Sequence, residues 1–378
     1  MAAERGQAEP EELRVTTLEL YFDLVFVFTL TQLTTLLEHD LSLVTALRVV
    51  LLFAILYWMY SGYVWLTNQV PPDRLRRRLL MFAGMAAFLV CALAIPHAFD
   101  ETGLEFGIGY LLVVLVHGGL YAQAFPSAAL RFVPLNAVAA LAIIGASLTD
   151  GPLSTALWIA PVPFQYFTSW LSQVVQPVEL SGLRVRPAHF VERHGLLLIV
   201  AFGESVVAVG IGIGDIAVDA AVLASVLLGL ALASALWWVY FGNEDERAVE
   251  VLRRASERHR GSLALNAYFY AFIPMLLGIV VVAAGIVLSV GHLGNPLALG
   301  TAALLSGGVA LYLGGEVLFR FILGLRPIAH RLAAAVAAVA VLPLGSSLAA
   351  GAQLAALVAV VVGMLALEAL QERAGAPA

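Results

Sequence analysis

Apolar segments of about 20 residues alternate with short polar loops along nearly the whole chain, and each is long enough to cross a bilayer core. The pattern predicts an all-α polytopic membrane protein with about twelve transmembrane helices. Very short turns join the fifth span to the sixth and the eleventh to the twelfth, which leaves a count of about ten or eleven open. The expected spans lie near 17–38, 43–66, 78–98, 106–125, 131–149, 153–174, 190–212, 218–241, 264–290, 297–319, 330–348 and 351–370.

The composition agrees with this fold class. Of the 378 residues, 61% are hydrophobic and 12% are charged, and the mean hydropathy is +0.93. Soluble domains are about half apolar and about a quarter charged, so the apolar excess is expected to face membrane lipid. The formal net charge of −6 argues against a nucleic-acid partner. Cys91 is the one cysteine, which excludes an intramolecular disulfide, and we expect no metal site and no cofactor.

The basic residues indicate an orientation. Apart from histidine they are all arginines, and they gather in the loops after the second, fourth, eighth and tenth spans and before the seventh. Cytoplasmic loops are enriched in arginine and lysine, so both termini are expected in the cytoplasm. The acidic segment 1–16 has no basic and apolar signal-peptide pattern, and we expect a cytoplasmic tail there.

The two halves of the chain share a pattern of aromatic and charged residues. The second span ends in a cluster from Tyr57 to Tyr60 and the eighth in a cluster from Trp237 to Tyr240, each followed by an arginine-rich loop. This predicts two parallel repeats of about six spans each. The alternative is that aromatic belts recur in any membrane protein. The expected units are a first repeat at 17–174, a linker at 175–189, a second repeat at 190–370 and a tail at 371–378.

Two carboxylates within apolar spans are the main candidates for function, because a charge at membrane depth is costly. Thr16 and Glu19 fit a capping box at the start of the first span, and Asp23 lies one turn further in. Asp23 must find a donor on another helix, find water or be protonated. Glu204 lies near the middle of its span, flanked by small residues. For both, ion or substrate binding competes with a structural bond between helices.

Four further polar residues in the spans are candidate ligand contacts. Pro161 and a second proline two residues later should break the sixth span, which would place Gln165 and Tyr166 beside freed backbone. His117 in the fourth span could relay protons. Arg48 could line a polar pathway. The competing interpretations are a packing kink, a hydrogen-bonded core histidine, and an arginine that snorkels to the outer surface.

Two acidic residues at the cytoplasmic ends of spans are expected to be structural. Glu316 lies one turn before Arg320, the favourable order for an ion pair along one helix. Glu368 lies near the end of the last span, where its side chain is expected to reach the interface.

Three separated motifs resemble those of the bacterial low temperature requirement A family. They read LELYFDLVFVFTLTQLT at 18–34, HFVERHGLLLIVAFGESVVAVG at 189–210 and WWVYFGNEDER at 237–247, and the similarity covers nearly the whole chain. The resemblance implies an integral membrane protein of the bacterial inner membrane, named for growth in the cold. It implies no catalytic or binding residues.

The leading hypothesis is a secondary transporter or ion-conducting permease in which Asp23 and Glu204 bind a proton, an ion or a small-molecule substrate. The alternative is a membrane sensor or scaffold in which these carboxylates only hold helices together. An enzyme is not expected, because no nucleophile and base are paired in the sequence. Membrane lipid is the one partner that the sequence indicates directly, and the oligomeric state stays open.

Overall fold

The structure, a computed structural model, describes residues 14–175, 185–213 and 217–375, and every regular element in these ranges is helical. In chain order the helices are α1 (Thr17–His39), α2 (Leu43–Gln69), α3 (Leu75–Ala94), η1 (Ile95–His97), α4 (Gly103–Ala124), α5 (Pro126–Ser147), α6 (Gly151–Ile159), α7 (Pro161–Val175), α8 (Pro187–Ile213), α9 (Ala220–Phe241), α10 (Glu244–Arg254), α11 (Glu257–Leu265), η2 (Asn266–Tyr270), α12 (Phe272–Ser289), α13 (Leu299–Leu323), α14 (Ala329–Ala340), α15 (Leu342–Ser347) and α16 (Ala350–Gly375). Most of the tail expected at 1–16 and of the linker expected at 175–189 lies outside the described residues.

By length and composition, 10 helical stretches in the described ranges are suited to cross a membrane. The helical membrane fold is therefore confirmed, while the arrangement of twelve spans in two repeats is not. The difference lies in the expected fifth and sixth spans. In α5 only the segment 132–147 is apolar, which is shorter than a membrane span requires. The sixth span is divided into α6, of 9 residues, and α7, of 15 residues. The break falls at Pro161, because proline has no backbone N–H to donate.

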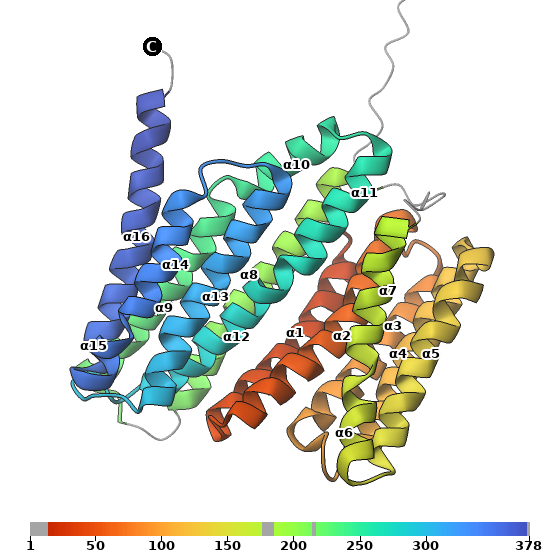
Figure 1. Ribbon diagram of the computed structural model, residues 1–378, viewed down its shortest axis with the longest axis horizontal. Coiled ribbons are helices and arrows are strands. Elements are labelled where there is room, and N and C mark those ends of the chain that lie inside the picture. Colours follow the sequence, from red (N-terminus) through yellow and green to blue (C-terminus); the bar gives the residue numbers. More distant parts are fainter. Residues whose placement is uncertain (1–13, 176–184, 214–216, 376–378) are drawn as a thin grey trace, which may run out of the picture.

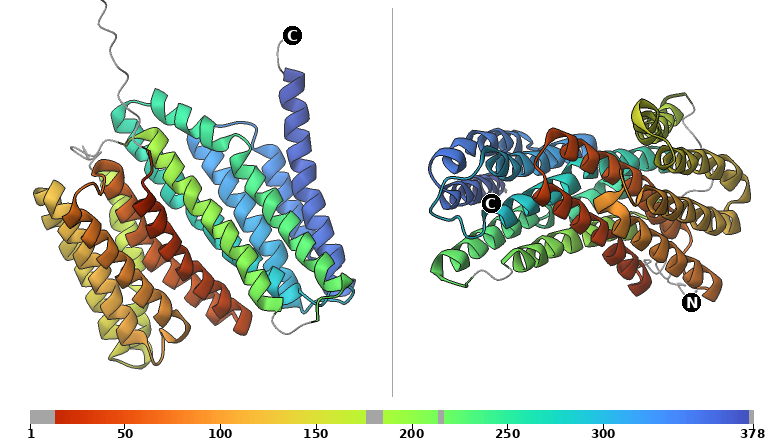
Figure 2. Two further views of the ribbon diagram at one scale, coloured as in Figure 1. Left: turned by 180° about the vertical axis from the view of Figure 1, so that it is seen from behind. Right: turned by 90° about the horizontal axis from the view of Figure 1, so that it is seen from below.

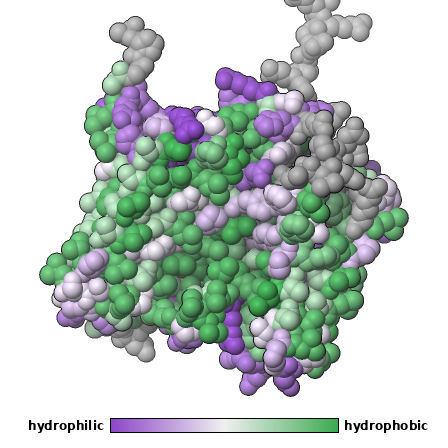
Figure 3. Space-filling model, in the orientation of Figure 1, coloured by the Kyte–Doolittle hydropathy of each residue, from purple (hydrophilic) through white to green (hydrophobic). Residues whose placement is uncertain are grey.

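The helices lie side by side in one bundle, with α1–α7 forming one half and α8–α16 the other (Figures 1 and 2). Helix α1 joins the halves, because it packs on α3 of its own half and on α8 and α12 of the other. The start of α1 and the end of α16 lie at the same end of the bundle (Figure 1). Apolar residues cover the side of the bundle, and polar residues gather at its two ends (Figure 3).

The start of α1 is fixed by the capping box, which the structure confirms. The Thr16 hydroxyl accepts a hydrogen bond from the backbone N–H of Glu19, and the Glu19 carboxylate accepts one from the backbone N–H of Thr16. The box satisfies two N–H groups that the first helical turn leaves without partners. It also fixes the direction in which the Glu19 side chain leaves the helix.

Glycines allow the closest helix contact in the second half, between α12 and α13. A Cβ atom at Gly308 would lie 2.7 Å from the backbone nitrogen of Val282, and one at Gly315 would lie 2.9 Å from that of Met275. Real Cβ atoms do not approach so closely, so these positions require glycine as long as the helices stay in place. Small residues at such contacts are typical of helix packing in membranes.

Candidate functional site

Asp23 of α1 is held in a buried ion pair with Arg193 of α8. The Arg193 Nε and Nη2 atoms donate to Asp23 at 2.8 Å to Oδ2 and 2.7 Å to Oδ1. The Tyr60 hydroxyl of α2 adds a hydrogen bond of 2.8 Å to Oδ1. Both charged side chains are fully buried. Of the three fates expected for Asp23, the structure shows the first, a donor on another helix.

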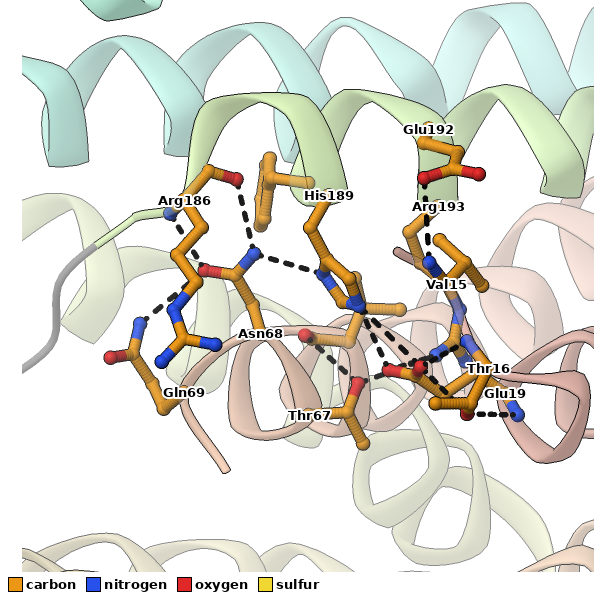
Figure 4. A network of polar contacts seen from close by, with 12 residues as sticks. Val15, Thr16, Glu19, Thr67, Asn68, Gln69, Arg186, His189, Glu192 and Arg193 are labelled. Atoms are coloured by element: carbon orange, nitrogen blue, oxygen red, sulfur yellow. Dashed lines mark hydrogen bonds and ion pairs between the residues drawn. The ribbon is translucent and has the colours of Figure 1, made fainter. Parts of the chain in front are cut away.

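The same arginine binds a second carboxylate. The Arg193 Nη1 atom lies 3.0 Å from Glu19 Oε1, and His189 Nε2 lies 3.4 Å from the same carboxylate. Glu19 and Asp23 are one helical turn apart on α1, and His189 and Arg193 are one turn apart on α8. Two acidic groups on one helix therefore face two basic groups at the same spacing on its neighbour. Figure 4 shows Glu19, His189 and Arg193 of this group. We call these four residues the α1–α8 network.

Helix α2 closes this network from the side. Asn68 donates to His189 Nδ1 at 3.1 Å, so the proton of a neutral His189 ring is left on Nε2, which faces Glu19. The Asn68 amide also bonds both backbone groups of Arg186, its oxygen accepting at 3.1 Å and its nitrogen donating at 3.3 Å. Thr67 accepts from Arg193 Nη1 at 3.3 Å. Three helices, α1, α2 and α8, are thus tied together where α1 and α8 begin (Figure 4).

A second ion-pair network joins α10, α13, α14 and α16, at the end of the bundle where α16 ends (Figure 1). Arg331 donates to Glu316 at 2.7 Å and to Glu244 at 3.1 Å. Arg320 donates to Glu368 at 2.9 Å and to Glu244 at 2.5 Å. We call these five residues the α13–α16 network.

The expected ion pair between Glu316 and Arg320 is not formed. Glu316 pairs instead with Arg331, which begins the next helix, and Arg320 turns toward Glu244 and Glu368. The Glu368 side chain was expected to reach the interface, but it is only 11% exposed and pairs with Arg320 and Arg331. The loop between α13 and α14 is short, so it brings a second arginine to Glu316 from a different direction.

Glu204 differs from the other carboxylates within the spans. It is half-buried on α8 and forms no hydrogen bond or ion pair with any of the described residues. It lines a narrow crevice between α1, α8 and α12, together with Thr31, Thr34 and Ser205. The crevice has a volume of about 10 Å³, which is close to the space that one water molecule requires.

Gln165 and Tyr166 lie one turn after the helix break, where they bond neighbouring helices. Gln165 donates to Asn136 Oδ1 at 3.0 Å and to the Tyr110 hydroxyl at 3.3 Å. The Tyr166 hydroxyl donates to the backbone oxygen of Ala54 at 3.0 Å. These contacts are consistent with the packing interpretation, and the ligand contact expected of both side chains stays a prediction.

His117 and Arg48 lie in different surroundings. His117 is 8% exposed and, with Gly62, lines a cavity of about 170 Å³. Its Nε2 atom has no hydrogen-bond partner among the described residues. The Arg48 guanidinium carbon lies 4.8 Å from the centre of the Phe99 ring, a cation–π contact. Near it, hydrogen bonds from Thr45 and Ser42 lower the pKa of Asp40, and the charge of Arg48 lowers that pKa further. This arrangement supports the snorkelling interpretation of Arg48.

The most strongly bonded arginines were not expected in these roles. The arginine pattern places Arg193 and Arg331 in cytoplasmic loops, yet Arg193 is fully buried and Arg331 is 2% exposed. One signal was present in the sequence, since Glu19 and Asp23 have the same spacing as His189 and Arg193. Within the described ranges, no group of three or more His, Cys, Asp or Glu side chains is placed to hold a metal ion.

Comparison with known proteins gives two matches. The family model described as bacterial low temperature requirement A protein matches residues 14–366. An uncharacterised protein of Rhizobium meliloti is 29% identical over 315 residues, which cover 79% of this chain and 75% of the relative. The family match spans α1 and α8 and so includes Asp23 and Glu204, and neither description states an activity.

Proposed function

This chain belongs to the bacterial low temperature requirement A family, and we propose that it works as a secondary transporter or ion-conducting permease of the bacterial plasma membrane. In this proposal Glu204 binds the transported or coupling cation, which is a proton or a small metal cation. The charged side chains of the α1–α8 network hold the two halves together at the end of the bundle where α1 starts and α16 ends, which the arginine pattern predicts to be the cytoplasmic side.

Glu204 is the observation that carries the proposal. Asp23, Glu19, Glu316 and Glu244 are all buried and all have arginine partners, so their charges are compensated. Glu204 has no such partner in the described part of the chain, although it lies within the apolar helix α8. An uncompensated carboxylate at this depth is costly and is typical of an ion or proton pathway. The hydroxyl groups of Thr31, Thr34 and Ser205 supply further oxygen atoms along the crevice.

The packing order supports a division into two parallel repeats of about six spans each. In the first half α3 packs on α4, α4 on α5, and α1 on α3. In the second half α12 packs on α13, α13 on α14, and α8 on α12 in the same order. Helices α1 and α8 are then equivalent, and the crevice that Glu204 lines lies between them. A site at the boundary of two repeats is typical of transporters that alternate their access.

The alternative function is a membrane sensor or scaffold, and the pairing of Asp23 favours it. A carboxylate that already accepts bonds from Arg193 and Tyr60 is not free to bind a transported ion in this conformation. In the transporter proposal Asp23 therefore acts as part of the joint between α1 and α8. In the scaffold alternative, joining α1 to α8 is the only role of Asp23, and Glu204 has no function in ion binding.

Transport by proteoliposomes separates the two functions. The purified protein is reconstituted into liposomes that contain a dye selective for protons, for sodium or for potassium, and the gradient of the matching ion is imposed in each case. We expect a flux of protons or of one of these cations above that of protein-free liposomes. A protein that is folded by thermal unfolding and moves none of them in any gradient would overturn the transporter proposal and leave the scaffold.

A further inference from the structure

A cavity of about 530 Å³ lies between the start of α1 and the start of α3, and we call it the α1–α3 pocket. Its volume is within the range of about 300–1,000 Å³ that is typical of small-molecule sites. It shares no described lining residue with the crevice of Glu204. The polar residues of its lining are Thr16, Thr17, Asp73 and Arg78, and the aromatic ones are Tyr21 and Phe82. Two prolines and a leucine complete the lining.

The pocket changes from polar to apolar along the direction of the helices. Tyr21 is one turn after Thr17 on α1, and Phe82 is one turn after Arg78 on α3. On both helices an aromatic ring therefore lies deeper along the bundle than a polar side chain. The two rings are 51% and 46% exposed, and their centres lie 6.5 Å apart. A phospholipid has the same order of groups, with a polar headgroup at the surface and acyl chains beneath it.

Arg78 has donors at this pocket that no described residue uses. Its Nε atom donates to the backbone oxygen of Pro72 at 3.1 Å, which holds the guanidinium beside the loop before α3. Neither of its Nη atoms forms a hydrogen bond or an ion pair within the described ranges, and the side chain is exposed. A guanidinium binds a phosphate group through two parallel hydrogen bonds. Arg78 is therefore oriented for an anion of this kind.

The charges around Arg78 favour a ligand with a net negative charge. Asp73 is the acidic residue of the lining, and it pairs with Arg77 at 2.9 Å. Arg74 and Arg76 are exposed, and neither has a carboxylate partner in the part of the chain that the structure describes. The first turn of α3 contains no acidic residue. A zwitterionic headgroup would bring another cation to this cluster, whereas an anionic headgroup brings none.

Thr17 adds a neutral donor from the opposite side of the pocket. The neighbouring Thr16 hydroxyl is used in the capping box with Glu19. The Thr17 hydroxyl is on an exposed residue and forms no hydrogen bond with the described residues. A hydroxyl group can donate one hydrogen bond to a phosphate oxygen. Donors from α1 and α3 thus flank the polar part of the pocket.

We propose that the α1–α3 pocket binds one anionic phospholipid. Its phosphodiester group contacts Arg78 and Thr17, and an acyl chain packs on Tyr21 and Phe82. The arginine pattern predicts that this end of the bundle is cytoplasmic, and arginine clusters at the cytoplasmic ends of membrane helices attract anionic lipids. The lipid would contact both α1 and α3, which pack on each other.

The full-length protein in detergent tests this proposal by native mass spectrometry, which gives the dissociation constant of the first bound lipid. Phosphatidylglycerol and phosphatidylcholine with the same acyl chains are titrated separately. We expect phosphatidylglycerol to bind about tenfold tighter, because hydrogen bonds between charged groups are stronger than neutral ones. Glycerophosphoglycerol has the same headgroup without acyl chains, and it should bind at least about a hundredfold more weakly than the lipid.

Two arginine variants separate the pocket from the general charge of the surface. Arg78→Gln removes the guanidinium that lines the pocket, so the ratio of the two lipid affinities should fall to about one or two. Arg76→Gln is the matched control, because it removes the same charge from an exposed position on the same helix but does not line the pocket. It should change the ratio by less than about twofold. Thermal unfolding shows that both variants are folded.

Three results would overturn the proposal. The first is equal affinity of the native protein for the two lipids, a result that needs no variant to fold. The second is an equal loss of preference in Arg78→Gln and Arg76→Gln, which would indicate a diffuse attraction to surface charge. The third is glycerophosphoglycerol binding as tightly as the lipid, which would indicate a site for a free phosphodiester. The proposal is independent of the transport function, since Glu204→Gln should leave the lipid preference unchanged.

Discussion

Asp23 of α1 and Arg193 of α8 form a bidentate ion pair between residues 170 positions apart in the sequence, with both side chains fully buried. The pair joins the first helix of each half. Because Arg193 also binds Glu19, one guanidinium compensates two carboxylates. Arg193 therefore has two acidic partners, whereas Asp23 has one arginine partner. Removing Arg193 and removing Asp23 should then change stability by different amounts.

Arg193→Met should destabilise the protein more than Asp23→Asn. The first change leaves two buried carboxylates without their arginine, with only Tyr60 bonded to Asp23 and His189 beside Glu19, and breaking a buried ion pair costs about 3–5 kcal/mol. The second change leaves Arg193 paired with Glu19 at 3.0 Å. Thermal unfolding in one detergent at pH 7 measures both, with the exposed Arg76→Met as control. A larger loss for Asp23→Asn than for Arg193→Met would contradict this account of the network.

In the α13–α16 network, Arg331→Met should be partly rescued by Glu316→Gln. Loss of Arg331 leaves Glu316 without its arginine, whereas Glu244 and Glu368 keep Arg320. An amide at residue 316 removes the orphaned charge, so the double variant should unfold at a higher temperature than Arg331→Met alone. The exposed Arg326→Met is the control. Strict additivity of the two changes would show that Glu316 and Arg331 do not depend on each other.

The contact between α12 and α13 predicts opposite effects at neighbouring glycines. Gly308→Ala places a Cβ atom 2.7 Å from the backbone nitrogen of Val282, and such overpacking costs about 1–3 kcal/mol. Gly307→Ala meets nothing within 4 Å and should leave stability unchanged or raise it slightly, since alanine favours helices. Thermal unfolding of the two variants measures the difference. Equal unfolding temperatures would mean that the two helices lie further apart.

The orientation can be tested by labelling single cysteines in a background in which Cys91 is replaced by alanine. Leu75→Cys lies in the arginine cluster at the start of α3, and Val218→Cys lies before α9. The arginine pattern places residue 75 in the cytoplasm and residue 218 outside. A membrane-impermeant maleimide added to intact cells should therefore label residue 218 only. Labelling of both positions, or of residue 75 alone, would contradict the orientation.

Features set by neighbouring residues were predictable from the sequence. The capping box at Thr16 and Glu19 depends on residues within one helical turn, and the break at Pro161 depends on one missing backbone donor. The helical membrane fold follows from apolar segments that only lipid can accommodate. Each of these features has a local physical cause.

Features that depend on which helices are neighbours were not predictable in the same way. From the sequence, Arg193 and Arg331 are expected in cytoplasmic loops, because positive charge near a span usually faces the cytoplasm. Their burial depends on carboxylates from α1, α10, α13 and α16, which no local pattern brings together. Glu316 shows the limit most clearly, since its nearest basic residue along the helix is Arg320 but its partner in space is Arg331.

The central claim is that Glu204 carries the transported or coupling cation, and Glu204→Gln tests it most directly. The amide keeps the shape of the side chain but cannot ionise. Native protein, Glu204→Gln and the exposed control Glu105→Gln are reconstituted at equal density, and their cation or proton flux is compared with their thermal unfolding. We predict that Glu204→Gln abolishes the flux at an unchanged unfolding temperature while Glu105→Gln keeps both. A folded Glu204→Gln variant with the full flux of the native protein would contradict the claim.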